Sequence, residues 1–266
     1  GKWKSLRNEL LRKMRDLGYL VNYIVLNATE FNVPQARERV FFIGFKRELK
    51  ENLNLPGLLE DYKITAQSVR ETLNVLGKAG HGNNSGKCNA KITLTKKPVM
   101  RKSPYAGMLF NGLGRPIKLD GYCSTLPASM GGNKTPIIDE KELYEFKKNW
   151  AVEYHSNLLK GNVEPDYKEA PNHLRRLTVE EAALIQTFPI GYEFSGSQSS
   201  KFRQIGNAVP CNLALQVAKM ILDNLNGCNK EKEIPIKVEN SQIHGNKYRQ
   251  VIGREEPAQS NQTVLQ

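Results

Sequence analysis

Three polar side chains stand at alternate positions at the start of an apolar stretch. Gln35, Arg37 and Arg39 lead into the run of residues 40–45, which is apolar apart from one glycine. Alternate side chains of an extended chain point to one side, so we expect these three to share a face. Two guanidinium groups and an amide there suit a phosphate, a carboxylate or the acceptor edge of a base. The alternative is a pair of strand-edge arginines neutralised by nearby carboxylates.

A second group of hydrogen-bonding side chains surrounds a pair of glycines. Gly131 and Gly132 allow the backbone to approach a surface closely, because glycine has no Cβ. Side chains beside them can donate to phosphates or to base edges. The group consists of Thr125, Ser129, Asn133 and Lys134. A phosphate-binding P-loop is excluded, since the chain lacks its Gly-Lys-Ser/Thr pattern. An ordinary flexible surface loop is the alternative.

Two arginines precede a predicted helix. Thr178 and Glu181 have the spacing of a capping box, and an apolar helical run follows them up to Pro189. Arg175 and Arg176 therefore lie just before the positive end of a helix, a place suited to a phosphate. An ordinary capped helix with two solvated arginines is the alternative.

A tight turn is predicted at Gly206 and Asn207, just before a long apolar helix that ends near Gly227. Asn207 can both donate and accept hydrogen bonds there. A helix this apolar must dock on other structure, for which we expect the sheet begun at residues 19–45. The two ends of the chain would then meet around its loop-rich middle.

The amino-terminal elements look like one edge of a larger sheet. Helical spacing covers residues 4–17, and β-rich runs cover residues 19–26 and 40–45. Such a helix, strand, loop and strand resemble the closing edge of an α/β sheet rather than a complete fold.

Composition points to a polyanionic partner. The 266 residues carry a formal net charge of +12, which favours nucleic acid first and an anionic membrane second. No run of 18 apolar residues is present, so we expect no membrane span. The four cysteines lack paired short spacing, which argues against a zinc site or disulfides and for a reducing cytoplasm.

Taken together, the motifs resemble those of cytosine-5 DNA methyltransferases over residues 1–226. Gln35, Arg37 and Arg39 match the family's Gln-x-Arg-x-Arg element. Residues 175–189 resemble its Arg-x-Leu-Thr-x-x-Glu helix ending in Phe-Pro, and residues 204–210 resemble its closing Gln-x-Gly-Asn-Ala-Val-Pro turn. Thr125 and Leu126 resemble its Thr-Leu pair before a glycine-rich loop.

The resemblance implies a methyltransferase of the bacterial restriction-modification type with an α/β fold. It would be the C-terminal edge of a Rossmann-like methyltransferase sheet plus a loop-rich target-recognition domain, closed by a C-terminal helix docking on the sheet. The implied division is residues 1–49 for the end of the catalytic domain, 50–173 for target recognition, 174–226 for the returning helices, and 227–266 for a flexible tail. The implied location is the bacterial cytoplasm, at the nucleoid.

The resemblance also implies a reaction and roles. The family moves a methyl group from S-adenosyl-L-methionine to carbon 5 of a cytosine flipped out of double-stranded DNA. Arg39 would hold the O2 atom of the base, Arg37 would reach a phosphate or brace the catalytic acid, and Gln35 would position the loop. The cofactor pocket would include Gly206, Asn207 and Ala208. DNA contacts would come from Thr125, Ser129, Gly131, Gly132, Asn133 and Lys134, with Arg175 and Arg176 gripping DNA phosphate or fixing the recognition region.

Three family elements are missing. The chain lacks the glycine-rich cofactor loop, the Pro-Cys-Gln nucleophile loop and the Glu-Asn-Val element, and Pro210-Cys211 begins a helix and is no substitute. We therefore expect the C-terminal part of an enzyme, inactive alone, that needs an N-terminal half upstream or on a separate subunit. No metal and no membrane are expected. The alternatives are a non-catalytic sequence-specific DNA-binding module and an RNA-directed member of the family.

Overall fold

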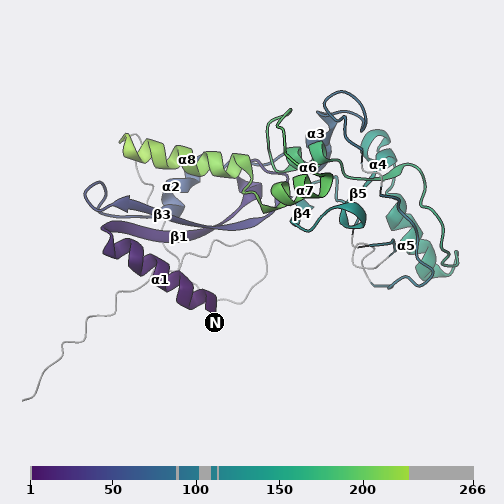
Figure 1. Cartoon of the computed structure of the whole chain (residues 1–266), viewed down its shortest axis with the longest axis horizontal. Coiled ribbons are helices and arrows are strands. Elements are labelled where there is room, and N and C mark those ends of the chain that lie inside the picture. Colours follow the sequence, from purple (N-terminus) through teal and green to yellow (C-terminus); the bar gives the residue numbers. More distant parts are fainter. Residues whose placement is uncertain (1, 88–89, 102–108, 113, 228–266) are drawn as a thin grey trace, which may run out of the picture.

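The computed structural model describes residues 2–87, 90–101, 109–112 and 114–227. The predicted flexible tail lies outside these residues, apart from its first, Gly227. Figure 1 shows two lobes: one contains α1, β1, β3, α2 and α8, and the other contains α3 to α7 with β4 and β5.

The first lobe is built on an antiparallel strand pair. β1 (Tyr19–Asn27) and β3 (Glu38–Lys46) pair along their whole length, from Tyr19 opposite Lys46 to Asn27 opposite Glu38. Helix α1 (Lys2–Asp16) precedes them and packs Leu11 against one face of the pair. Gly18, at φ +88°, lets the chain leave the helix and enter β1. These three elements confirm the sequence prediction.

Helix α8 (Cys211–Leu225) covers the other face of the strand pair. Leu213, Val217 and Met220 pack against a core that includes Ile24 and Ile43. Helix α2 (Leu55–Leu59) joins the same core, and the 3-10 helix η2 (Glu60–Tyr62) follows it. The predicted docking of the last helix on the sheet is confirmed.

One segment, Gln198–Leu225, is long and apolar enough to cross a membrane by length and composition. It consists of two helices, α7 (Gln198–Asn207) and α8, with a break at residues 208–210. The apolar face of α8 is used in the core of the first lobe, which accounts for its composition.

The second lobe holds short elements joined by long loops. Its main core unites α3 (Val69–Asn74), α6 (Val179–Ile185) and α7 with the chain around β4 (Cys123–Ser124). A smaller core forms around β5 (Ile137–Asp139), β6 (Leu174–Arg176) and α5 (Trp150–Lys160). The remaining helices of the described residues are α4 (Glu140–Glu145) and the 3-10 helices η1 (Ala28–Glu30) and η3 (Gly132–Lys134).

The lobes are joined where the chain changes pairing partner. β2 (Gln35–Ala36) pairs in parallel with β4 of the second lobe, whereas β3 pairs with β1. The strand predicted at residues 40–45 therefore begins earlier, at Glu38, and the extended segment before it is interrupted at Arg37, because the residues on either side belong to different sheets. This interruption places Arg37 at the junction of the lobes.

We expect Leu213→Ala to lower the free energy of unfolding by about 2–4 kcal/mol, because it would leave a cavity between α8 and the strand pair. The matched control is Leu215→Ala on the same helix, whose side chain is 47% exposed and whose loss should cost under about 1 kcal/mol. Urea denaturation followed by circular dichroism measures both. Equal costs would contradict the docking of α8.

Candidate functional site

The guanidinium of Arg37 is the centre of the site. The side chain is 1% exposed, and its Nη2 donates to the carbonyl oxygens of Gly206 at 2.7 Å and Ala208 at 2.9 Å. Its Nη1 donates to the carbonyl oxygen of Leu126 at 3.2 Å. Burial, and next the charge of Arg39, lowers the pKa of Arg37 to about 10, which leaves it charged at neutral pH. Arg37 thus joins three segments that are distant in sequence.

Gln35 supports the same junction. It is fully buried, and its Oε1 accepts from the backbone N–H of Leu126 at 3.1 Å. Gln35 and Arg37 therefore share a face, as predicted, but that face is turned inward. These two side chains therefore do not form the open ligand-binding face expected from the sequence, because backbone groups of the second lobe already hydrogen-bond to them.

Arg39 differs from its two neighbours. Its side chain is partly exposed on β3 and donates to the carbonyl oxygen of Glu38 at 2.7 Å. Burial lowers its pKa. Among the three residues of the motif, Arg39 is the one whose guanidinium a ligand can reach.

Gly206 lies inside helix α7, so the turn predicted at Gly206 and Asn207 is wrong, and the chain bends at residues 208–210. Helix α7 crosses the chain at Ala128 so closely that a Cβ on Gly206 would lie 2.5 Å from the Cα of Ala128. Glycine is needed here for close approach and not for a left-handed conformation. Asn207, the last residue of α7, is exposed.

A hollow of about 510 Å³ lies between the glycine-rich loop and α7. Three of the predicted DNA-contacting residues, Ser129, Gly131 and Lys134, line it together with Asn207. Sequence reasoning missed two further lining residues, Ser199 and Arg203. The signal that could have found them is the spacing of Ser199, Arg203 and Asn207 at successive intervals of four residues, which places all three on one face of a helix.

The remaining loop residues lie at the surface, and hydrogen bonds to other segments of the protein fix their position. Thr125, which is exposed, donates its hydroxyl to the carbonyl oxygen of Ala36 at 2.8 Å. Gly132 and Asn133 are exposed in η3. The carbonyl oxygen of Asn133 accepts from the backbone N–H of Gly114 at 3.1 Å.

Arg175 and Arg176 are used inside the protein. Arg175 forms ion pairs with Glu140 and Glu181, each at 2.7 Å. Burial lowers the pKa of Arg175, but these two carboxylates outweigh it and raise the pKa above its ordinary value. Arg176 is 1% exposed and donates to the carbonyl oxygens of Thr135 at 2.9 Å and Asn133 at 3.2 Å.

Of the two roles expected for this arginine pair, the contacts fit the fixing of the recognition region. Gripping DNA phosphate does not fit, because both guanidinium groups are held by protein atoms. The alternative of two solvated arginines is also wrong. The capping box of Thr178 and Glu181 is confirmed, and the carboxylate that caps α6 is the one that binds Arg175.

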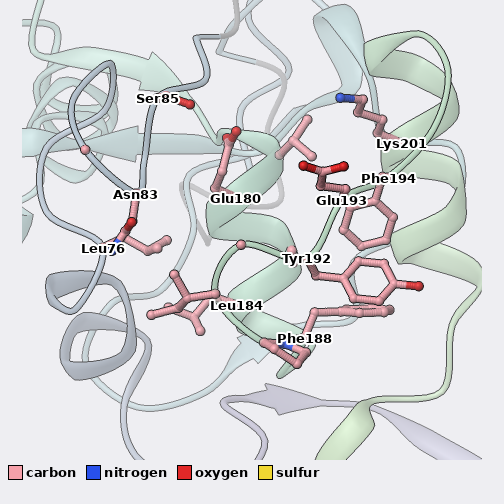
Figure 2. A pocket seen from close by; sticks show the side chains of 16 residues that line it. Leu76, Asn83, Ser85, Glu180, Leu184, Phe188, Tyr192, Glu193, Phe194 and Lys201 are labelled. Atoms are coloured by element: carbon pink, nitrogen blue, oxygen red, sulfur yellow. The ribbon is translucent and has the colours of Figure 1, made fainter.

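Figure 2 shows a second hollow, of about 440 Å³, beside α6 and α7. Phe188, Tyr192 and Phe194 line it, with ring centroids 4.8–5.0 Å apart, and Lys201 stands at the same hollow. It contains none of the site residues predicted from the sequence.

The described cysteines are poor nucleophiles. Burial raises the pKa of Cys123 to about 12 and also raises the pKa of Cys211, so neither thiol is activated. Over the described ranges, no group of three or more His, Cys, Asp or Glu residues could hold a metal ion. His155 is buried and its Nε2 hydrogen-bonds the carbonyl oxygen of Arg101 at 2.9 Å, in a packing role.

Comparisons with protein-family models and with curated proteins both find DNA methyltransferases. The sequence model of the C-5 cytosine-specific DNA methylase family matches residues 2–223. Type II methyltransferase M.PspPI of Psychrobacter sp. (strain TA137) is 28% identical over 223 residues, covering 84% of this chain and 50% of that protein. Type II methyltransferase M.Sau96I of Staphylococcus aureus is 28% identical over 232 residues, covering 80% of this chain and 45% of that protein. The chain thus spans about half the length of these curated relatives.

Among solved structures, the S. pombe Dnmt2 methyltransferase superposes with a TM-score of 0.53 at 15% identity. The match covers 83% of this chain and 62% of that one. It indicates a shared α/β fold.

We expect Arg37→Ala to lower the free energy of unfolding by roughly 2–4 kcal/mol, because it would leave the carbonyl oxygens of Gly206 and Leu126 buried without a donor. Arg39→Ala removes the same charge from a partly exposed position and should cost under about 1 kcal/mol. Thermal and urea unfolding measure the difference. A small cost for Arg37→Ala would show that the lobes do not depend on it.

Proposed function

The chain belongs to the C-5 cytosine-specific DNA methylase family, and we propose that it is the carboxyl-terminal part of a DNA (cytosine-5-)-methyltransferase. The complete enzyme would transfer a methyl group to carbon 5 of a flipped cytosine in a specific duplex sequence. This chain would supply target recognition and part of the active site. The nucleophilic cysteine would come from an amino-terminal half, upstream or on a partner chain.

The observation that carries the proposal is the contact set of Arg37. One guanidinium holds the closing motif through Gly206 and Ala208, and the segment before the glycine-rich loop through Leu126. Three separate motifs of a methyltransferase thus meet at one charged group. For Arg37 itself, we propose a positioning role in place of a direct contact with the flipped nucleotide.

Arg39 is the residue we propose to contact the base. Its guanidinium is partly exposed, so it can donate to the O2 atom of cytosine. Addition of a thiolate at carbon 6 places negative charge on the ring, and a fixed cation stabilises that charge. Gln35 and Arg37 would hold the start of β3 in place during this step.

S-adenosyl-L-methionine would supply the methyl group when bound. Of the three predicted cofactor residues, Asn207 fits this role, because its side chain is exposed at the end of α7. Gly206 and Ala208 would act indirectly, since Arg37 holds their carbonyl oxygens and so fixes the backbone around Asn207. The other contacts would come from the amino-terminal half.

Target recognition would lie in the glycine-rich loop. Ser129, Asn133 and Lys134 are exposed and can donate to base edges or phosphates, while Gly131 and Gly132 allow close approach. Thr125 is exposed too, but it donates its hydroxyl hydrogen to the carbonyl oxygen of Ala36, so it would accept a hydrogen bond from a base edge. The net charge of +12 would attract double-stranded DNA. We propose a bacterial cytoplasmic location, at the nucleoid.

The second candidate is a non-catalytic sequence-specific DNA-binding module. It is favoured by the raised pKa values of Cys123 and Cys211, which leave the described residues without an activated thiol. Mixing separates the two functions. The full chain is combined with a polypeptide that carries the Pro-Cys-Gln and cofactor motifs, and transfer of labelled methyl groups to duplex DNA is measured. We expect transfer only with both components, whereas a binding module would gain no activity.

In the assembled enzyme, we expect Arg39→Ala to lower kcat by about 100-fold or more and to change duplex affinity far less, because the contact strengthens as charge builds on the ring. Lys46→Ala is the control: it removes an exposed charge from the other end of the same strand and should leave kcat unchanged. Single-turnover methylation and duplex titration give the two quantities. Equal losses of kcat and affinity for Arg39→Ala would reduce its role to binding.

A further inference from the structure

The hollow between the glycine-rich loop and α7 has the chemistry of an anion site. Lys134 and Arg203 contribute two positive charges to its lining, and Ser129 and Ser199 contribute hydroxyl groups. No carboxylate is found among the lining residues that the structure describes. Such a set favours a ligand that is negatively charged and accepts several hydrogen bonds.

Both cations are available to a ligand. The side chains of Lys134 and Arg203 are exposed, and neither side chain forms an ion pair or hydrogen bond with any residue in the described part of the chain. They contrast with Arg37, Arg175 and Arg176, whose guanidinium groups are held by protein atoms. The charge in this hollow is therefore not used for folding.

The two sides of the hollow are held close together. Ser199 and Arg203 lie one turn apart on α7, while Phe202 and Ile205 bury the opposite face of that helix. Across the hollow, a Cβ on Gly131 would lie 3.3 Å from the hydroxyl oxygen of Ser199. Because the backbone on both sides is held in this way, binding of an anion would have to order only the side chains of Lys134 and Arg203.

We propose that this hollow binds one backbone phosphate of the DNA, held between Lys134 and Arg203, with Ser199 as a further donor. The inference rests on the proposed DNA-binding function and adds Arg203 and Ser199 to it. A DNA phosphate is favoured over a free phosphate ion because two lining residues, Gly131 and Lys134, flank Gly132 and Asn133 in the sequence, which are exposed loop residues proposed to face the duplex. This contact would set the register of the loop and would not depend on sequence.

The test compares two variants of the same helix. Arg203→Ala and Lys201→Ala each remove one positive charge from α7, but Lys201 lines the other hollow (Figure 2). Affinity of the full chain for a labelled duplex of mixed sequence is measured across a range of salt concentrations. We expect Arg203→Ala to weaken binding by roughly 5–10-fold at low salt and to reduce the slope of log K against log salt by about 1. Lys201→Ala should leave the slope unchanged.

Further arms identify the ligand. Lys134→Ala should reproduce the Arg203→Ala effect, and the double variant should lose less than the product of the two, because both cations contact one phosphate. Equal effects of Arg203→Ala and Lys201→Ala would overturn the proposal and leave DNA binding intact. Binding of inorganic phosphate that Arg203→Ala abolishes, with duplex affinity unchanged by the same variant, would assign the hollow to a free anion and overturn the proposal. If the unmodified chain does not bind duplex DNA, the proposed function fails as well.

Discussion

The structure depends on a buried positive charge, Arg37, that forms no ion pair with any carboxylate among the described residues. Arg37 is balanced by the carbonyl oxygens of Gly206, Ala208 and Leu126. Removing a charge from water is costly unless hydrogen-bonding partners are in place, so these three segments must be correctly assembled before the guanidinium can be buried. The relative position of the two lobes is thereby linked to one side chain.

The same principle organises the second lobe. Its described strands are two or three residues long, so backbone pairing alone gives little order. Arg176 holds the carbonyl oxygens of Thr135 and Asn133, and Arg70 holds that of Leu143 at 2.8 Å together with the carboxylate of Asp120. Buried guanidinium groups thus satisfy backbone carbonyl oxygens that the strands of a larger sheet would otherwise pair. The positive net charge consequently includes several arginines that serve the fold.

The sequence predicted the regular elements well and the direction of the polar side chains poorly. Hydrophobic spacing identified α1, β1, β3, α6 and α8, because each has a local period that needs no knowledge of its partner. The role of Arg37 could not be read in the same way, since its acceptors lie 89 and 169 residues further along the chain. The prediction of a turn at Gly206 is wrong because both a turn and a close approach between distant segments require glycine, and the sequence does not distinguish them.

The site contains two kinds of residue: inward side chains whose partners are distant in sequence, and surface side chains that remain open to a ligand. Inward side chains such as Arg176 fix the backbone of Asn133, while the side chains of that same loop remain at the surface. A loop held from behind can present its outer face to a ligand without losing much freedom on binding. Arg203 and Lys134 complete this arrangement at the surface, because their side-chain charges have no partner among the described residues where the loop meets α7. The buried arginines therefore determine the shape of the surface, and the exposed ones determine what it attracts.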